Sequence, residues 1–265
     1  MSWAANRVIV YLTLAVFAAV FLYQLVLTVP FIEALGVAGS TALAVFLTWA
    51  MSREIDPAHD WSAFAGLPFT LAAALLYGSP TLITLFFLLL FSRMINGTTG
   101  RRATLFDAVM LSALAVILFT NSVFIGLPLL ALGFGFEAIT VPGNRDKAYF
   151  SVLSIIIFIV MLIFFYPDHY YVPGYNLYTG TAALIMIILT IILIAGTKES
   201  RVKADHGNKK LENRRILLTQ AAAAFFIITE LFFKGNIALV MLYPVLFAYL
   251  GTAVYNLVRR PDRGG

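Results

Sequence analysis

The sequence has no cysteine, and only 12% of its 265 residues are charged. The absence of cysteine excludes disulfides, thiolate catalysis and zinc or iron–sulfur centres with cysteine ligands. Soluble domains carry roughly 25% charged residues, so this chain has too little polar surface to cover a water-soluble globule of its size. With 61% hydrophobic residues, the expected solvent is lipid, in which a chain satisfies its backbone within helices or closed barrels.

Long apolar runs decide between these two architectures. Barrel strands alternate apolar and polar residues over about ten positions, whereas runs such as Ser151–Phe165 and Thr181–Ala195 are continuous. They predict helices, and we expect an all-α, polytopic transmembrane helix bundle of about ten spans. The expected spans are 8–30, 35–51, 62–78, 80–92, 105–120, 122–140, 148–166, 177–196, 216–233 and 237–257.

The distribution of positive charge predicts the orientation of the bundle. With the N-terminus inside, the alternating loops place 17 of the 18 Lys and Arg residues in the cytoplasm, all except Lys234. Because a Lys and Arg bias in short loops sets orientation, both termini are expected inside. We therefore expect an integral protein of a bacterial or archaeal cytoplasmic (inner) membrane.

The number of spans depends on the segment 62–92. Each half has about 15 residues, roughly 22 Å of helix, against a hydrocarbon core of about 30 Å. Gly78-Ser79-Pro80 predicts a turn with Ser79 as a helix N-cap. One long helix here would reverse every later loop and destroy the charge pattern. We expect two short helices, and the alternative is eight spans plus a short or re-entrant hairpin at 62–92.

The polar segment 197–215 divides the predicted bundle. We expect 1–196 to form a membrane helix bundle of about eight spans, 197–215 a cytoplasmic basic linker, and 216–265 a C-terminal transmembrane hairpin with a short tail. The linker is where a protein partner would dock, and membrane lipids are the other expected partners. The basic residues lie between apolar segments, where they act as topology signals and headgroup contacts. No nucleic-acid partner is expected.

A first candidate site lies at the predicted membrane–water boundary. Three carboxylates and a histidine fall within seven residues: Glu54, Asp56, His59 and Asp60. These are candidate catalytic residues, with His59 as an acid or base near neutral pH. If the protein is an enzyme, Glu54 and Asp56 suit Mg²⁺, which binds through one or two carboxylates together with substrate phosphates. The alternative makes Asp60 the N-cap of the next helix and the others solvated loop residues.

A second candidate site is the loop from Arg93 to Arg102, which holds two glycines, two threonines and three arginines. Backbone N–H and guanidinium groups in such a loop suit an anion. The loop lacks the P-loop spacing and its lysine, so nucleotide hydrolysis is not indicated. The alternative is an Asn-Gly turn flanked by topology-setting arginines. The candidate substrate- or anion-binding residues are Arg53, Arg93, Asn96, Thr98, Thr99, Arg101, Arg102, Asp107 and Glu137.

Acidic residues within or beside the spans are further candidates, because such residues are costly in lipid. Asp107 also fits a capping box at the start of its span. Glu137 lies near the inner end of its span, with the charged residues 145–147 just beyond. Glu230 and Lys234 are four apart, which predicts a structural ion pair on the outer side.

Three classes of function remain open. A small transporter or flippase for a small-molecule or lipid substrate is favoured, since ten closely connected helices without a soluble domain are typical of one. The second class is a membrane-embedded enzyme acting on a phosphorylated or lipid substrate at the cytoplasmic interface. The paired NDxxD-type motifs of membrane prenyltransferases and the D-G-x-x-A-R pattern of CDP-alcohol phosphotransferases are absent. The third class is a membrane scaffold or assembly subunit that docks its partner at 197–215.

Overall fold

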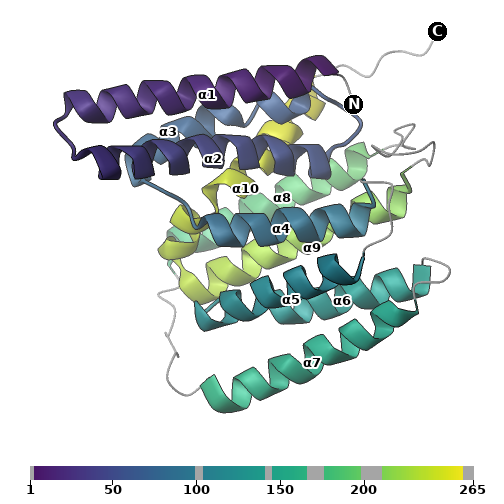
Figure 1. Ribbon diagram of the computed structural model, residues 1–265. Coiled ribbons are helices and arrows are strands. Elements are labelled where there is room, and N and C mark those ends of the chain that lie inside the picture. The colour runs from purple at the N-terminus through teal and green to yellow at the C-terminus, as the bar shows by residue number, and fades with distance from the viewer. Residues whose placement is uncertain (1–2, 99–103, 141–144, 166–175, 198–210, 259–265) are drawn as a thin grey trace, which may run out of the picture.

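The structure is a computed structural model that describes residues 3–98, 104–140, 145–165, 176–197 and 211–258 (Figure 1). Every regular element in these ranges is a helix, which confirms the all-α prediction. The α-helices are α1 (Trp3–Val26), α2 (Phe31–Ile55), α3 (Leu67–Tyr77), α4 (Leu82–Asn96), α5 (Leu105–Thr120), α6 (Gly126–Thr140), α7 (Asp146–Phe165), α8 (Leu177–Gly196), α9 (Asn213–Lys234) and α10 (Asn236–Val258), with the 3₁₀ helix η1 (Ser62–Phe64) before α3.

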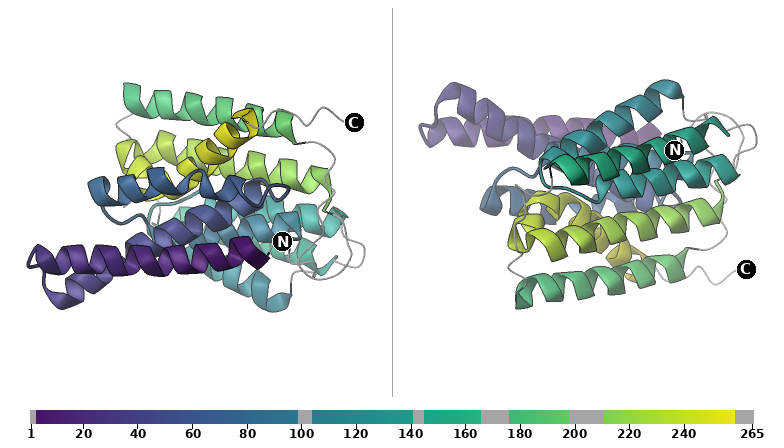
Figure 2. Two further views of the ribbon diagram at one scale, coloured as in Figure 1. Left: turned by 90° about the horizontal axis from the view of Figure 1, so that it is seen from above. Right: turned by 90° about the horizontal axis from the view of Figure 1, so that it is seen from below.

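Six of these helices are long and apolar enough to cross a membrane: α1, α2, α7, α8, α9 and α10. The shorter apolar helices are η1 with α3, then α4, α5 and α6. A chain with this many long apolar helices is a multi-pass helical membrane protein. The three most exposed long helices, α1, α7 and α8, lie on three different sides of the bundle (Figures 1 and 2). Their apolar side chains are the surface that lipid covers.

The segment 62–92 forms two short helices joined by a tight turn, as expected, but the turn is built differently. Gly78 adopts a positive φ of 81°, a conformation that favours glycine. The N-cap of α4 is Thr81 rather than Ser79, so the predicted Ser79 cap is wrong. The Ser79 hydroxyl lies 2.5 Å from that of Ser40 on α2 instead.

The centre of the bundle is filled by aromatic side chains. The Phe87 and Phe91 rings of α4 stack on each other, and Phe87 also contacts Phe226 of α9. Phe134 of α6 belongs to the same buried cluster. Helices α9 and α10 pack against α2, α4 and α8 within this one core.

The predicted domain division at 196 and 216 stays a prediction, since 198–210 lie outside the described residues.

Two glycines bring the start of α3 directly onto the backbone of α10. A Cβ added at Gly251 would collide with the backbone of Gly66, and one added at Gly66 would collide with the Phe247 carbonyl. Close backbone approach of this kind is what small residues permit between membrane helices. The contact fixes the position of α3 along the axis of α10.

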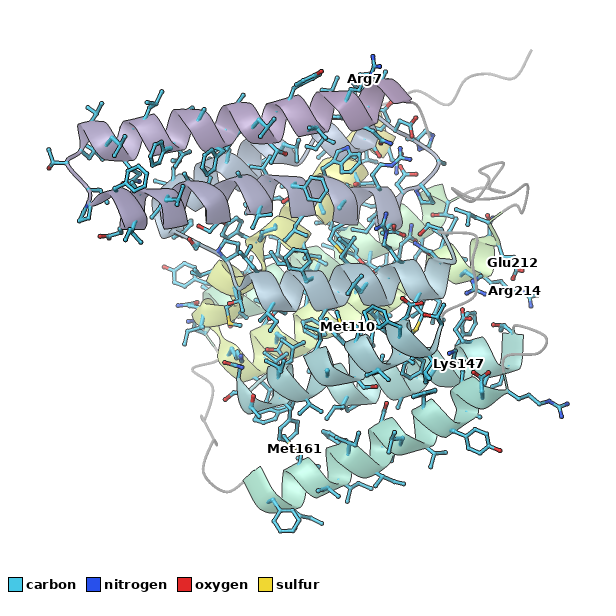
Figure 3. The ribbon with its side chains drawn as sticks, viewed as in Figure 1. Arg7, Met110, Lys147, Met161, Glu212 and Arg214 are labelled. Carbon is cyan, nitrogen blue, oxygen red and sulfur yellow. The ribbon has the colours of Figure 1, made fainter. Side chains whose placement is uncertain are left out.

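The chain runs back and forth, so that odd-numbered helices begin and even-numbered helices end at one end of the bundle (Figure 1). We call it the basic end, because Arg53, Arg93 and Arg215 lie in the helix turns there. Arg7, Lys147, Glu212 and Arg214 lie toward the same end (Figure 3). The opposite end, where α9 meets α10, is called the Lys234 end.

Candidate functional site

Glu54 lies in the last turn of α2 and is only 2% exposed. Its carboxylate accepts hydrogen bonds from Arg93 Nε at 3.1 Å, Asn96 Nδ2 at 3.0 Å and Thr98 Oγ1 at 3.1 Å. Asn96 Nδ2 also donates to the Glu54 backbone carbonyl at 2.7 Å. The structure thus joins the two candidate loops of the sequence. Charge-assisted hydrogen bonds of this kind are strong, and both carboxylate oxygens of Glu54 are occupied by them.

A second buried ion pair lies at the C-terminal end of α4 and involves α6 and α9. Gly97 ends α4 in the left-handed conformation, with φ of 66°, which is a common helix C-cap. Arg215 of α9 donates to the Ile95 carbonyl at 2.6 Å and the Met94 carbonyl at 3.3 Å, satisfying the otherwise unpaired last turn. The same guanidinium pairs with Glu137 of α6, which is 3% exposed.

These two ion pairs tie α2, α4, α6 and α9 together at the basic end. Buried charges are tolerated in proteins when they are paired and hydrogen-bonded. Each carboxylate here receives donors from a different helix, so the network fixes the relative positions of four helices. We call this network the clasp, and it consists of Glu54, Arg93, Asn96, Thr98, Glu137 and Arg215.

The remaining residues of the first candidate loop pair among themselves. Arg53 forms an ion pair with Asp60, and His59 Nδ1 lies 2.9 Å from Asp56. The helix η1 has Trp61 as its N-cap, without a side-chain cap from any described residue. The predicted Asp60 N-cap is therefore wrong, because the nearby Arg53 guanidinium binds that carboxylate instead.

The carboxylates of this loop do not converge on one point. Each of the three has a different partner: the α4 end for Glu54, His59 for Asp56 and Arg53 for Asp60. Within the described ranges, no three His, Asp or Glu side chains lie close enough together to hold a metal ion. The described residues therefore form no metal centre with three such ligands, and a Mg²⁺ site of one or two carboxylates stays a prediction.

Asp107 has the capping role expected of it. Its carboxylate accepts from the Thr104 backbone N–H at 2.7 Å, and the Thr104 hydroxyl accepts from the Asp107 N–H at 3.2 Å. This confirms the capping box at the start of α5.

Lys147, although only 1% exposed, donates to the Thr104 carbonyl at 3.3 Å. Three candidates of the second loop, Thr99, Arg101 and Arg102, lie outside the described residues.

Sequence reasoning missed two residues on α9 that bridge helices. Arg215 pairs with Glu137 across 78 residues, whereas the sequence pointed to 145–147 as the nearest charges. Gln220 Nε2 donates to the Ile55 carbonyl at the end of α2 at 2.8 Å. A glutamine inside an apolar helix is a signal for interhelical hydrogen bonding, and Gln220 carried that signal.

Polar contacts follow the interface of α2 with α3 from the Lys234 end to the middle of the bundle. Near the Lys234 end, the Tyr243 hydroxyl of α10 donates to the Gly78 carbonyl at 3.1 Å, beside the Ser40–Ser79 contact. In the middle, the buried Thr48 and Thr70 hydroxyls lie 2.9 Å apart.

A separate group of polar contacts lies toward the basic end, on α9 and α10. The Tyr249 hydroxyl donates to the Gln220 backbone carbonyl at 2.5 Å. Thr252 lies one turn further along α10, and its buried hydroxyl has no partner among the described residues. We call these groups together the polar seam, and it consists of Ser40, Thr48, Thr70, Ser79, Gln220, Tyr243, Tyr249 and Thr252.

At the Lys234 end, Glu230 and Lys234 form the ion pair that their spacing predicted. The two charged atoms, Glu230 Oε2 and Lys234 Nζ, are 3.8 Å apart. Lys234 Nζ is closer to the Asn121 carbonyl, to which it donates at 3.0 Å. This pair lies within one helix, in contrast to the clasp.

No protein-family model, curated protein or solved structure matches this chain.

Proposed function

We propose that the protein is a small membrane transporter and that the polar seam is its substrate path. The observation that carries the proposal is the distribution of the seam residues, which lie near the Lys234 end, in the middle and toward the basic end of a largely apolar bundle. Polar groups within a membrane are costly and mark substrate pathways. The seam residues are uncharged hydroxyls and one amide, so the substrate class they suit is a small, neutral, hydrogen-bonding molecule.

The proposal includes ten membrane crossings, with the basic end and both termini in the cytoplasm. The shortest crossing, α3, has 11 residues, about 16 Å of helix. Such a helix is tolerated at membrane depth where protein surrounds it and its connections, and α3 packs against α2 and α10. The positive charge gathered at the basic end favours a cytoplasmic position for that end, in a bacterial or archaeal inner membrane.

The clasp leaves Glu54 without a free carboxylate oxygen for catalysis at the interface. A catalytic carboxylate needs an oxygen within reach of its substrate, and both oxygens of Glu54 are occupied by side chains of α4. Of the docking segment required by a scaffold, 198–210 lie outside the described residues. The seam therefore supports transport more directly than any described feature supports the other two classes.

The absence of native cysteine provides a direct test with single-cysteine variants. Thr48→Cys and Thr70→Cys introduce thiols of similar size into the middle of the seam, and a membrane-impermeant maleimide is applied to oriented vesicles from each side. A transporter exposes the seam to both sides in turn, so we expect labelling from both. Leu88→Cys, buried in the apolar core of α4, is the matched control and should stay unlabelled.

The proposal fails if Thr48→Cys and Thr70→Cys are as unreactive as Leu88→Cys in folded protein. Solutes that protect Thr48→Cys from the maleimide are then tested for uptake into proteoliposomes. Topology is tested with the same reagent at two exposed positions. Glu212→Cys at the basic end should react only from the cytoplasmic side, and Glu33→Cys, in the first turn of α2, only from the other.

A further inference from the structure

Glu230 differs from the clasp carboxylates in what surrounds it. It is 2% exposed, and its Oε2 atom has no hydrogen-bond partner among the residues that the structure describes. At 3.8 Å, Lys234 Nζ is beyond hydrogen-bond distance from that oxygen, while it donates to the Asn121 carbonyl at 3.0 Å. The ammonium is thus engaged by a backbone carbonyl, and the carboxylate is left short of donors.

A second buried oxygen lies at the same level of the bundle. Helices α4 and α9 are antiparallel, since Arg215 at the start of α9 binds the end of α4. The Phe87 and Phe226 rings meet across this helix pair, with centroids 6.2 Å apart. One turn closer to the Lys234 end come Thr84 on α4 and Glu230 on α9, on the same helix faces as these rings. Thr84 is fully buried, and its Oγ1 atom also has no partner in the described part of the chain.

The charged surroundings of Glu230 are simple. The elements that pack against this end of α9 are α4, α8, α10 and the turn after α5. Among the described residues, Lys234 is the charged group that they and α9 itself bring to Glu230. The other groups that the structure places on Lys234 are uncharged, namely the Asn121 carbonyl and the Met241 sulfur. Elsewhere at this end, Glu33 and Tyr178 are exposed, and the Tyr243 hydroxyl is bonded to Gly78.

From this geometry we propose that Glu230 is a proton-binding site within the membrane, with Thr84 as its hydrogen-bonding partner. A proton from water at the Lys234 end binds the carboxylate, and the neutral carboxyl group turns to donate to the Thr84 hydroxyl, to which its Oε2 atom is not hydrogen-bonded in this structure. Lys234 keeps its charge and stays on the Asn121 carbonyl. When the proton leaves, the carboxylate draws Lys234 toward itself, because an unpaired buried charge is costly. The two arrangements differ in the position of one side chain and one proton.

Coupling follows from the place of Glu230 on α9, and this step rests on the proposed transport function. The same helix carries Gln220 of the polar seam and Arg215 of the clasp, so α9 links the proton site to both. A change of pairing at Glu230 therefore acts on the helix that borders the substrate path. The inferred activity is proton-coupled transport of a neutral solute.

The test uses infrared spectroscopy of the purified full-length protein as a function of pH. A protonated carboxyl group in an apolar site gives a carbonyl stretching band distinct from that of exposed carboxyl groups. We expect this band near neutral pH in the unmodified protein and in the matched control Glu33→Gln. The band should be absent from Glu230→Gln, a near-isosteric change whose folding is checked by circular dichroism. Spectra of Glu230→Gln that equal those of the unmodified protein at every pH overturn the proposal.

Two further variants test the partners of the proton. Lys234→Met removes the cation that competes with the proton, so the band should appear at higher pH than in the unmodified protein. Thr84→Val keeps the shape of the side chain but removes the acceptor, so the band should move in frequency and appear at lower pH. A band that responds to neither substitution overturns the assigned partners and with them the site.

The infrared band and the cysteine labelling separate the two proposals. If the band is present but Thr48→Cys is not labelled from both sides, the proton site stands and the transport function falls. If labelling is two-sided and the band is absent, transport stands and the proton site falls. With both present, coupling predicts that labelling of Thr48→Cys depends on pH, and that Glu230→Gln abolishes this dependence.

Discussion

Buried carboxylates at the two ends of the bundle differ in how many hydrogen-bond donors surround them. At the basic end, Glu54 and Glu137 receive donors from other helices, and Glu54 has one on each oxygen. At the Lys234 end, Glu230 has a cation nearby, but its Oε2 atom accepts no hydrogen bond from a described residue. A carboxylate held by several donors stabilises the fold, whereas one that lacks donors is free to exchange a proton.

The ends also differ in what their ion pairs connect. The partners of Glu54 lie 39 to 44 residues away in the sequence, and Arg215 lies 78 residues from Glu137. Such pairs fix helices relative to one another. Glu230 and Lys234 are one turn apart on α9, so their pairing can change without separating any two helices. This contrast assigns stability to the basic end and movement to the Lys234 end.

The largest loss of stability is expected from Arg215→Met at the basic end. The substitution removes the cation that pairs with the buried Glu137, and breaking a buried pair from one side costs about 3–5 kcal/mol. It also uncaps the last turn of α4. The measurement is denaturant unfolding in detergent, followed by tryptophan fluorescence. Arg214→Met, at the exposed neighbouring position, should change stability by no more than about 0.5 kcal/mol. Equal losses in the two variants would contradict the clasp.

A smaller loss is expected from Glu54→Gln, which keeps the size of the side chain and removes its charge. Hydrogen bonds to a charged group contribute about 1.5–3 kcal/mol, and the partly exposed Arg93 places the expected loss in the lower half of that range. Unfolding is measured in the same way, with Glu33→Gln as the exposed control. If Glu54→Gln is as stable as Glu33→Gln, Glu54 is not a structural residue and returns to the catalytic candidates.

The sequence predicted contacts within one helix and missed contacts between distant helices. Apolar runs predicted the helices, and short-range pairs such as Asp107 with its cap and Glu230 with Lys234 were recognised from spacing alone. The partner of Glu137 was not, because helical periodicity relates residues three or four apart and says nothing of residues on distant helices. The two candidate loops were recognised separately, and only the packing of α2 against α4 shows that Glu54 lies among the donors of the second loop.

An intermediate case is Asp107, an exposed carboxylate whose donors come from the start of its own helix. Removing a capping side chain costs about 0.5–2 kcal/mol, and we expect Asp107→Ala to cost about 1 kcal/mol or less because the site is open to solvent. Thr104→Ala is the matched variant, since it removes the other half of the same box. Because the two residues act together, the double variant should lose less than the sum of the single losses. Additive losses in the unfolding measurement would show that they act separately.

The smallest effect is expected from Glu230→Gln, the same chemical change as Glu54→Gln at the other end. The proposed carboxyl group is protonated and neutral near neutral pH, so the near-isosteric amide removes no charge, and the carboxyl Oε2 atom has no hydrogen bond from a described residue to lose. The change in stability should therefore be the smallest of the set. Unfolding of the two glutamine variants is compared in one detergent at one pH. A larger loss in Glu230→Gln than in Glu54→Gln would reverse the assignment, because Glu230 would then be the structural carboxylate. The expected order instead leaves Glu230 as a buried acid that the fold does not need, which is what the proposed proton site requires.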